Sequence, residues 1–332
     1  MKLTRDNFVK KINTLSKDYR FYGPVRHEKR GRYSDTDLVY YELTDNFLDF
    51  DFSVKSDFSA KELTNPLNQT LFHFVNDKMI ESDYDNRPVI VFLRSCDLHA
   101  FKRLDQIYLK NKYKDGYYKR LRDLLNFAVI GCKSEFDSCF CTTFGTNTTD
   151  QYQIGINLSK DSVVVDIKDD KFSVFGKNNK DFILDHVKKN KNKVKLPKLV
   201  ELEQVIDSEI WEEYNTRCIG CGSCNFVCPT CSCFTTQDIA YDKDKTKGER
   251  KRVLASCMVD GFSNMAGGHS FRDKKGERMR FKLMHKVNDF NKRFGYDMCV
   301  GCGRCDNICP ELISFSNQIN KLTNEVGERN EK

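Results

Sequence analysis

Apolar residues along the first two hundred positions recur at spacings typical of both helices and strands. Residues 3–17 place Phe8, Ile12 and Leu15 three or four positions apart, which predicts a short helix. Runs of aromatic and β-branched residues follow, separated by polar turns, and these predict strands. The strands expected in this part of the chain are 21–22, 38–41, 50–54 and 70–75.

Two continuous apolar runs, 88–93 and 127–131, predict strands that are buried on both faces. Between them, residues 97–109 carry apolar residues at helical spacing. Three more strands are expected at 152–158, 163–167 and 171–175. Residues 1–200 therefore predict an N-terminal mixed α/β domain.

The stretch KKNKNKVKLPK at residues 188–198 is basic and polar, so we expect a solvated linker and a domain boundary there. A helix at 201–214 would lead into the second domain, residues 201–332. A second helix is expected from about residue 277 to 294. The overall expectation is an α+β chain whose second domain is α-helical.

Composition narrows the class of protein. The 332 residues include 55 Lys and Arg against 48 Asp and Glu, a formal charge of +7, and 39% are hydrophobic. These values exclude a collagen-like, low-complexity or wholly disordered chain. No run approaches the roughly 20 apolar residues of a membrane helix, and the first residues do not form a signal peptide. We expect a soluble, cytoplasmic protein with no membrane partner.

Fifteen cysteines are the unusual feature of the composition. An odd number cannot pair completely, and a long chain without an export signal favours metal over disulfides. Eight of them form two copies of the pattern C-x2-C-x2-C-x3-C-P, at residues 218–229 and 299–310. Bacterial ferredoxins bind [4Fe–4S] clusters with this run. Zinc is the alternative, but zinc sites usually contain pairs of C-x2-4-C rather than triples.

The spacing also predicts which cysteines share a cluster. Three thiolates two residues apart lie on one tight loop, whereas the fourth lies on the following turn and ligates the other cluster. The first cluster is expected to be held by Cys218, Cys221, Cys224 and Cys309. The second is expected to be held by Cys299, Cys302, Cys305 and Cys228. The helical second domain, residues 201–332, is therefore expected to be a dicluster ferredoxin-like domain.

A third [4Fe–4S] site is predicted in the N-terminal domain. Cys96 and Cys132 each follow a predicted buried strand, and ligands gather at the carboxyl ends of strands in α/β sheets. Cys139 and Cys141 lie a few residues further on. Asp97 is an alternative ligand, or instead the N-cap of its helix. The thiols could also be buried cysteines that act as small hydrophobic side chains.

The remaining thiols, Cys231, Cys233 and Cys257, repeat a C-x-C-plus-one arrangement beside the first motif. They could bind metal together with His269, but packing beside the cluster is the interpretation we favour.

Residues 272–293 hold nine Lys and Arg against three acids. The candidate roles of this stretch are a nucleic-acid face, a solvated helix face or a docking patch for an acidic partner. We favour the last two roles and expect no nucleic-acid partner. The positive charge would also offset the negative charge of nearby clusters and raise their potentials.

Several segments together resemble the iron–sulfur electron-transfer subunit of the anaerobic sulfite reductase and, more distantly, the β subunit of cytoplasmic NAD(P)-linked nickel–iron hydrogenases. The segments are 94–100 (RSCDLHA), 139–141 (CFC), 228–234 (CPTCSCF), 256–257 (SC), 265–269 (MAGGH), 284–286 (MHK) and 299–302 (CVGC). The resemblance covers residues 21–310. The segments around Cys96 and Cys231 are the most specific part of this resemblance. The two ferredoxin runs are less specific, because such runs occur in many families.

The resemblance implies a non-catalytic electron-transfer subunit. It would relay electrons from a flavin-containing, NAD(P)H-oxidising subunit to a siroheme subunit that reduces sulfite to sulfide. The first alternative is the electron-transfer β subunit of a nickel–iron hydrogenase. The others are an enzyme that uses an open iron at the third site, and a nucleic-acid-binding module. The chain carries no recognisable flavin or nicotinamide motif, which agrees with a relay.

Overall fold

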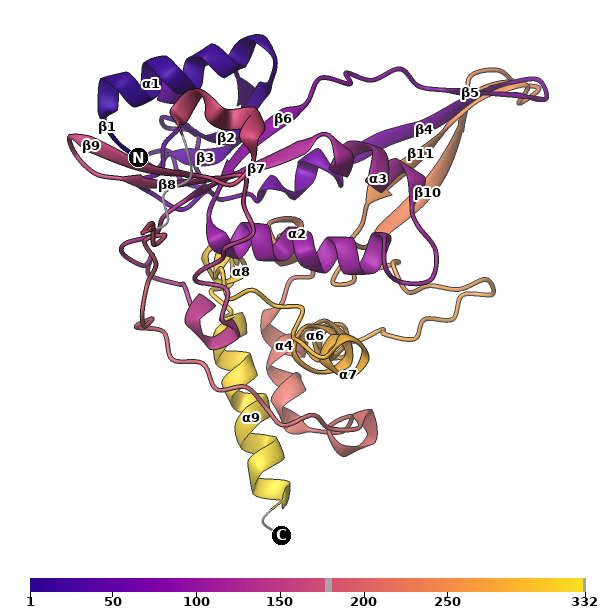
Figure 1. Ribbon diagram of the computed structural model, residues 1–332. Coiled ribbons are helices and arrows are strands. Elements are labelled where there is room, and N and C mark those ends of the chain that lie inside the picture. Colours follow the sequence, from indigo (N-terminus) through magenta and orange to yellow (C-terminus); the bar gives the residue numbers. More distant parts are fainter. Residues whose placement is uncertain (177–180, 331–332) are drawn as a thin grey trace.

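The computed structural model describes residues 1–176 and 181–330. It contains two β-sheets and a C-terminal group of helices (Figure 1). The larger sheet has seven strands in the order β1-β9-β8-β7-β6-β2-β3. Its strands are β1 (Lys2–Thr4), β2 (Arg20–His27), β3 (Leu38–Thr44), β6 (Val89–Leu93), β7 (Leu125–Ile130), β8 (Ile154–Leu158) and β9 (Ser162–Ile167).

The centre of this sheet is parallel and its edges are antiparallel. Strands β2, β6, β7 and β8 run in the same direction, whereas β3, β9 and β1 pair antiparallel. Both central apolar runs, β6 and β7, are buried on both faces as predicted. The carboxyl ends of β6 and β7 therefore lie side by side, which places the residues after them at one edge of the sheet.

Helices cover both faces of the sheet. Helix α1 (Arg5–Thr14) packs Phe8 and Ile12 against one face, in a core shared with Phe92 and Ile130. Helices α2 (Ser95–Tyr108) and α3 (Gly116–Asp123) cover the other, where the core includes Leu98, Phe101, Tyr118, Val91 and Val129. Alternate residues of one strand thus enter opposite cores, as strand geometry requires.

The second sheet joins distant parts of the chain and projects from the body as an arm (Figure 1). Strands β4 (Asn68–Val75) and β5 (Lys78–Glu81) come from the N-terminal half, whereas β10 (Phe234–Ala240) and β11 (Lys247–Leu254) lie between the two cysteine motifs. The order is β10-β11-β4-β5. The two halves of the chain therefore share one sheet across residue 200.

The C-terminal part is largely helical and has its own core, which includes Trp211, Tyr214, Leu283, Ile319 and Leu322. Its helices are α4 (Glu212–Arg217), α5 (Ser223–Phe226), α6 (Lys275–Met284), a π-helical turn (His285–Asp289), α7 (Phe290–Phe294), α8 (Arg304–Ile308) and α9 (Phe315–Asn330). The α+β class and the helix near 277–294 are confirmed. Within the described residues, no helix combines the length and hydropathy needed to cross a membrane.

Three local predictions are wrong. Residues 50–54 form no strand and follow a 3₁₀ turn at Phe47–Asp49, and residues 171–175 lie in a 3₁₀ segment, Asp170–Phe175. The helix expected at 201–214 is replaced by two 3₁₀ turns (Leu202–Gln204, Glu209–Trp211) before α4. In the first two segments aromatic side chains pack into the core without any strand, because apolar burial does not require one backbone conformation.

The basic stretch at 188–198 is not a free linker. Its lysines lie largely at the surface, but Asn190 and Val194 are buried, and Val194 packs into the C-terminal core. Asn190 also accepts a hydrogen bond from the Thr142 amide at 2.9 Å. The expectation of a solvated linker fails because every few residues an apolar or amide side chain is fixed against the body.

A buried ion pair joins the sheet layer to the helical part. Arg304 of α8 contacts both carboxylate oxygens of Asp97 in α2, at 2.6 and 2.9 Å, and both side chains are almost fully buried. The Arg304 guanidinium also donates to the carbonyl and hydroxyl of Ser56. Removing one member of such a pair leaves a buried charge without its partner.

We therefore expect Arg304→Met to destabilise the protein by about 3–5 kcal/mol. Urea unfolding of the anaerobically purified chain, followed by circular dichroism, measures the change. The matched control is Arg250→Met, which breaks the exposed pair of Arg250 with Asp238 and should leave the midpoint unchanged. Equal midpoints for the two variants would show that the Asp97–Arg304 pair does not hold the two parts together.

Candidate iron–sulfur centres

The two ferredoxin-like loops have the same local geometry. In the first, the Gly220 amide donates to Cys218 Sγ at 3.4 Å, and in the second the Gly301 amide donates to Cys299 Sγ at the same distance. Both glycines adopt positive φ, 70° and 63°, a conformation that other residues rarely accept. Each loop thus curls around its first sulfur, as a cluster-binding loop requires.

Each predicted ligand set surrounds one cavity. The first cavity is lined by Cys218, Cys221, Cys224 and Cys309, with Cys305 at its inner side. The second is lined by Cys299, Cys302, Cys305 and Cys228. Helices α5 and α8 pack against each other, and the last cysteine of each motif follows one of them. As a result Cys228 lines the second cavity and Cys309 lines the first. We propose these two sets as the ligands of two clusters.

The arrangement of the thiols favours a cluster over a single metal ion. Among the described residues, no three Cys, His, Asp or Glu side chains converge tightly enough to hold one ion. A zinc ion would draw its sulfurs to about 2.3 Å from one point. Here the thiols instead stand around cavities. Burial raises the pKa of Cys299 to about 12, so this thiol is neutral until iron displaces its proton.

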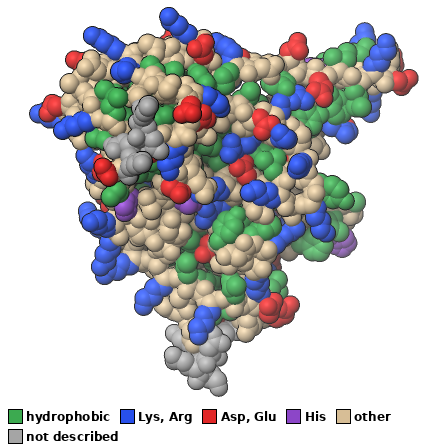
Figure 2. Space-filling model, in the orientation of Figure 1, with side chains coloured by type: hydrophobic (Ala, Val, Ile, Leu, Met, Phe, Trp, Pro, Cys, Tyr) green, Lys and Arg blue, Asp and Glu red, His purple; other side chains and the backbone are tan. Residues whose placement is uncertain are grey.

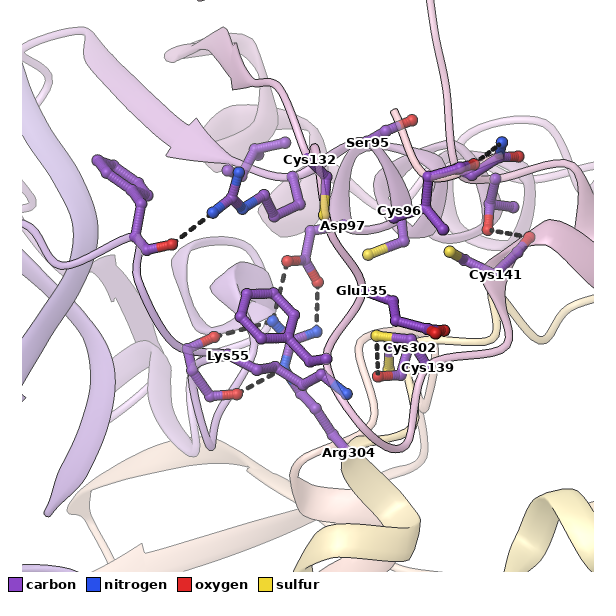
Figure 3. A pocket seen from close by; sticks show the side chains of 18 of the residues that line it. Lys55, Ser95, Cys96, Asp97, Cys132, Glu135, Cys139, Cys141, Cys302 and Arg304 are labelled. Carbon is purple, nitrogen blue, oxygen red and sulfur yellow. Dashed lines mark hydrogen bonds and ion pairs between the residues drawn. The ribbon is translucent and has the colours of Figure 1, made fainter. Parts of the chain in front are cut away.

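A third cavity lies at the carboxyl ends of β6 and β7 (Figure 3). Cys96 comes from the first turn of α2, Cys132 follows β7, and Cys139 and Cys141 lie at the start of a 3₁₀ turn, Cys141–Phe144. All four line this cavity, as the sequence predicts. Burial also raises the pKa of Cys141, to about 12. We propose that these four thiols hold a third cluster.

The structure argues against Asp97 as a ligand in this state. Both of its oxygens contact Arg304, and the Tyr41 hydroxyl lies 3.4 Å from one of them. Its predicted alternative role as N-cap is wrong, because Arg94 occupies the N-cap position and Asp97 lies inside the first turn. Asp97 instead anchors Arg304 beside the third cavity.

The third cavity and the second are in direct contact. The Phe140 amide donates to the Gly301 carbonyl at 2.8 Å, and Cys139 Sγ lies 3.8 Å from the Cys302 carbonyl. A side chain at residue 301 would meet the Phe140 carbonyl at 2.5 Å, so only glycine permits this approach. Cys302 lines both cavities, and Cys305 lines both the second and the first. The second cavity is therefore the middle one of a row.

Buried cations surround these cavities, and our expectations from the sequence did not include them. Lys61 is buried and donates to the carbonyls of Asn225, Cys228 and Cys231 at 2.8–3.2 Å. Lys286 is buried and donates to Thr230 Oγ1 at 2.6 Å. Neither forms an ion pair with a carboxylate in the described part of the chain. Their positive charge faces the thiols instead.

The basic stretch 272–293 is therefore not simply a solvated face. Arg278, Lys282 and Lys286 follow one another at four-residue spacing and are buried on one side of the helical segment. The spacing was a usable signal, because it places them on the same side as the apolar residues Met279 and Leu283. Figure 2 shows one face of the molecule, on which Lys and Arg side chains are interspersed with acidic ones.

The three remaining thiols lie outside the cavities. Cys257 packs into the C-terminal core, and its Sγ accepts a hydrogen bond from Asn225 Nδ2 at 3.1 Å. Cys231 is buried, and Cys233 lies at the edge of the same core. His269 is exposed in a turn. This arrangement agrees with packing beside the clusters rather than with a metal site that includes His269.

Comparison with known proteins indicates 4Fe-4S chemistry in the C-terminal part of the chain. Residues 217–313 match the family model of a 4Fe-4S dicluster domain. The whole chain is 31% identical over 351 residues to the sulfhydrogenase 2 subunit beta of Pyrococcus furiosus, covering 99% of this chain and 98% of the relative. The chain belongs to this sulfhydrogenase beta-subunit family. No solved structure matches it.

Membership of the sulfhydrogenase beta-subunit family has two consequences. The dicluster match shows that the C-terminal part carries 4Fe-4S chemistry, so iron–sulfur electron transfer is supported. The relative's name describes one subunit of a hydrogenase assembly, which favours our first alternative, the hydrogenase β subunit. The sulfite reductase that we expected first finds no support in the comparisons.

The third site can be tested by its iron content. Replacing Cys132 by Ser should lower the iron of the anaerobically purified chain by about four atoms, one cubane. The matched control is Cys233→Ser, which alters a thiol that lines none of the three cavities. Its iron content should equal that of the unaltered chain. An unchanged count in the Cys132 variant would remove the third cluster, and a loss in the Cys233 variant would make that thiol a ligand.

Proposed function

We propose that this chain is the iron–sulfur relay subunit of a hydrogenase-type complex. It passes single electrons between a flavin-containing, NAD(P)-linked partner and the subunit that carries the hydrogen chemistry. The observation that carries this proposal is the row of three cysteine-lined cavities, in which neighbours share a lining cysteine. Family membership and the dicluster match support it.

The shared cysteines define the order of the relay. Cys302 lies between the third cavity and the second, and Cys305 lies between the second and the first. Clusters in these cavities would be separated by little more than a ligand side chain. An electron entering at either end thus passes through the middle cluster, and each cluster cycles between two oxidation levels.

The chain's own groups tune these clusters. Amides of Gly220, Gly301 and Ile313 donate to Cys218, Cys299 and Cys309 Sγ, each at 3.4 Å. Hydrogen bonds to ligand sulfurs and nearby positive charge both favour the reduced, more negative cluster. The chain has no phosphate-binding fingerprint for flavin or nicotinamide, so those cofactors are assigned to the partners.

One end of the row reaches the surface. Cys221 is exposed, and the first cavity is lined by Ile219, which is 58% accessible. Leu312 is 76% accessible and lies in the chain between Glu311 and Ile313, which both line this cavity. Leu312 adopts φ 53°, an unfavourable conformation for a residue with a side chain. Exposed apolar side chains gathered on a surface mark sites of contact with other proteins. We propose this surface as the contact with a partner subunit.

Leu312→Asp should slow hydrogen-dependent NAD(P) reduction by the assembled complex by roughly tenfold, the loss expected for one interface anchor of about 1.4 kcal/mol. Iron content should not change, because Leu312 holds no iron. The control is Tyr113→Asp, which places the same charge at an 86% exposed aromatic residue away from the three cavities. Equal rates for the two variants would move the partner contact elsewhere.

A further inference from the structure

Lys282 occupies a position that no other described lysine shares. It lies in the last half of α6 (Lys275–Met284) and lines both the first and the second cavity. Lys286, one turn later, lines the second cavity but not the first. The Lys282 side chain therefore stands at the boundary between the two ligand sets, where Cys224 and Cys305 approach from α5 and α8.

The ammonium of Lys282 is buried without an oxygen or nitrogen partner. The residue is 3% exposed, and among the described residues its Nζ is the only buried lysine nitrogen without an oxygen or nitrogen hydrogen-bond partner. Its nitrogen lies over the ring of Phe315, 5.1 Å from the centroid. Lys61 and Lys286, by contrast, donate to carbonyls and to a hydroxyl. A buried charge without a partner is strongly unfavourable, so this position favours an anion close to the ammonium.

The anions within reach are sulfurs. The Lys282 side chain lines the first cavity together with Cys224, and it lines both cavities together with Cys305. Cys224 belongs to the first proposed ligand set and Cys305 to the second. A thiolate-bound cubane carries net negative charge and offers sulfur acceptors.

We propose that Lys282 is a shared cationic bridge that hydrogen-bonds sulfur atoms of the first and second clusters and raises the reduction potential of both. This inference rests on the two C-terminal clusters of the proposed function. An added electron makes a cluster more negative, so a fixed cation nearby favours the reduced form. Because one charge faces both clusters, it raises both potentials in parallel and leaves the difference between them nearly unchanged, so it does not bias the electron toward either cluster. Lys286 acts on the second cluster alone.

The test is an anaerobic redox titration of the full chain, followed by electron paramagnetic resonance. In Lys282→Met, the midpoint potentials of both C-terminal clusters should fall, each by at least the 59 mV that corresponds to a tenfold change for one electron. In Lys286→Met, the potential of the second cluster alone should fall. Lys282→Arg keeps the charge and should stay close to the unaltered chain. Lys275→Met, which removes a lysine of the same helix outside both cavities, should change neither potential.

Iron content separates the two possible failures. If the unaltered chain holds no iron, the proposed function fails. If Lys282→Met keeps its iron and neither potential moves, or only one moves, the bridge is wrong while the relay stands.

A second measurement tests the bridge even if the Lys282→Met variant does not assemble its clusters. With ¹⁵N-lysine in the unaltered protein, a nitrogen hyperfine coupling should appear in the signal of the reduced first cluster, whose cavity contains Lys282 as its single lysine among the described residues. Absence of this coupling would also overturn the bridge.

Discussion

The structure depends on the balance between buried sulfur anions and buried cations. Twelve thiols gather around three cavities, and burial raises the pKa of two of them, Cys141 and Cys299, to about 12, so these two are neutral until iron binds. Iron makes them anionic, and the low-dielectric surroundings strengthen every charge interaction that follows. This negative charge is offset by three cations on different elements of the fold, Lys61, Lys282 and Arg304. Neither the anions nor the cations would be stable in these positions alone.

The same balance explains why the two halves of the chain are inseparable. Arg304 lies between two cysteine ligands of the second motif, yet its partners are Asp97 of α2 and Ser56 of the N-terminal half. Lys61 comes from the N-terminal half and holds the carbonyls of the first motif's last turn. The close approach at Gly301 adds a backbone contact. The cavities form a continuous row because these contacts hold the sheet edge against the cysteine loops.

Much of this arrangement could be predicted from the sequence, because it follows from local periodicity and motif spacing. The apolar runs predicted strands β6 and β7, and the residues that follow adjacent parallel strands lie at one edge of the sheet. Cys96 and Cys132 could therefore be predicted to lie close together. The second sheet was missed, since β4 pairs with β11 from far along the chain and neither strand encodes its partner. Lys282 was assigned to a docking or solvated face, because a basic composition usually means solvent exposure. Only the three-dimensional arrangement shows which lysines turn inward.

The terminal partner could not be read from the residues for a different reason. A cysteine motif specifies that a cluster is bound, but the destination of the electron depends on another polypeptide. Sulfite and hydrogen complexes can therefore use the same relay chemistry. Overall similarity along the chain, rather than any single residue, favoured the hydrogenase alternative.

The most direct test of this account is the iron and acid-labile sulfide content of the unaltered chain, purified without oxygen. Three cubanes predict about twelve of each per polypeptide. A content of about eight would leave the N-terminal cavity empty and break the proposed row. A colourless protein that holds zinc would contradict the account as a whole.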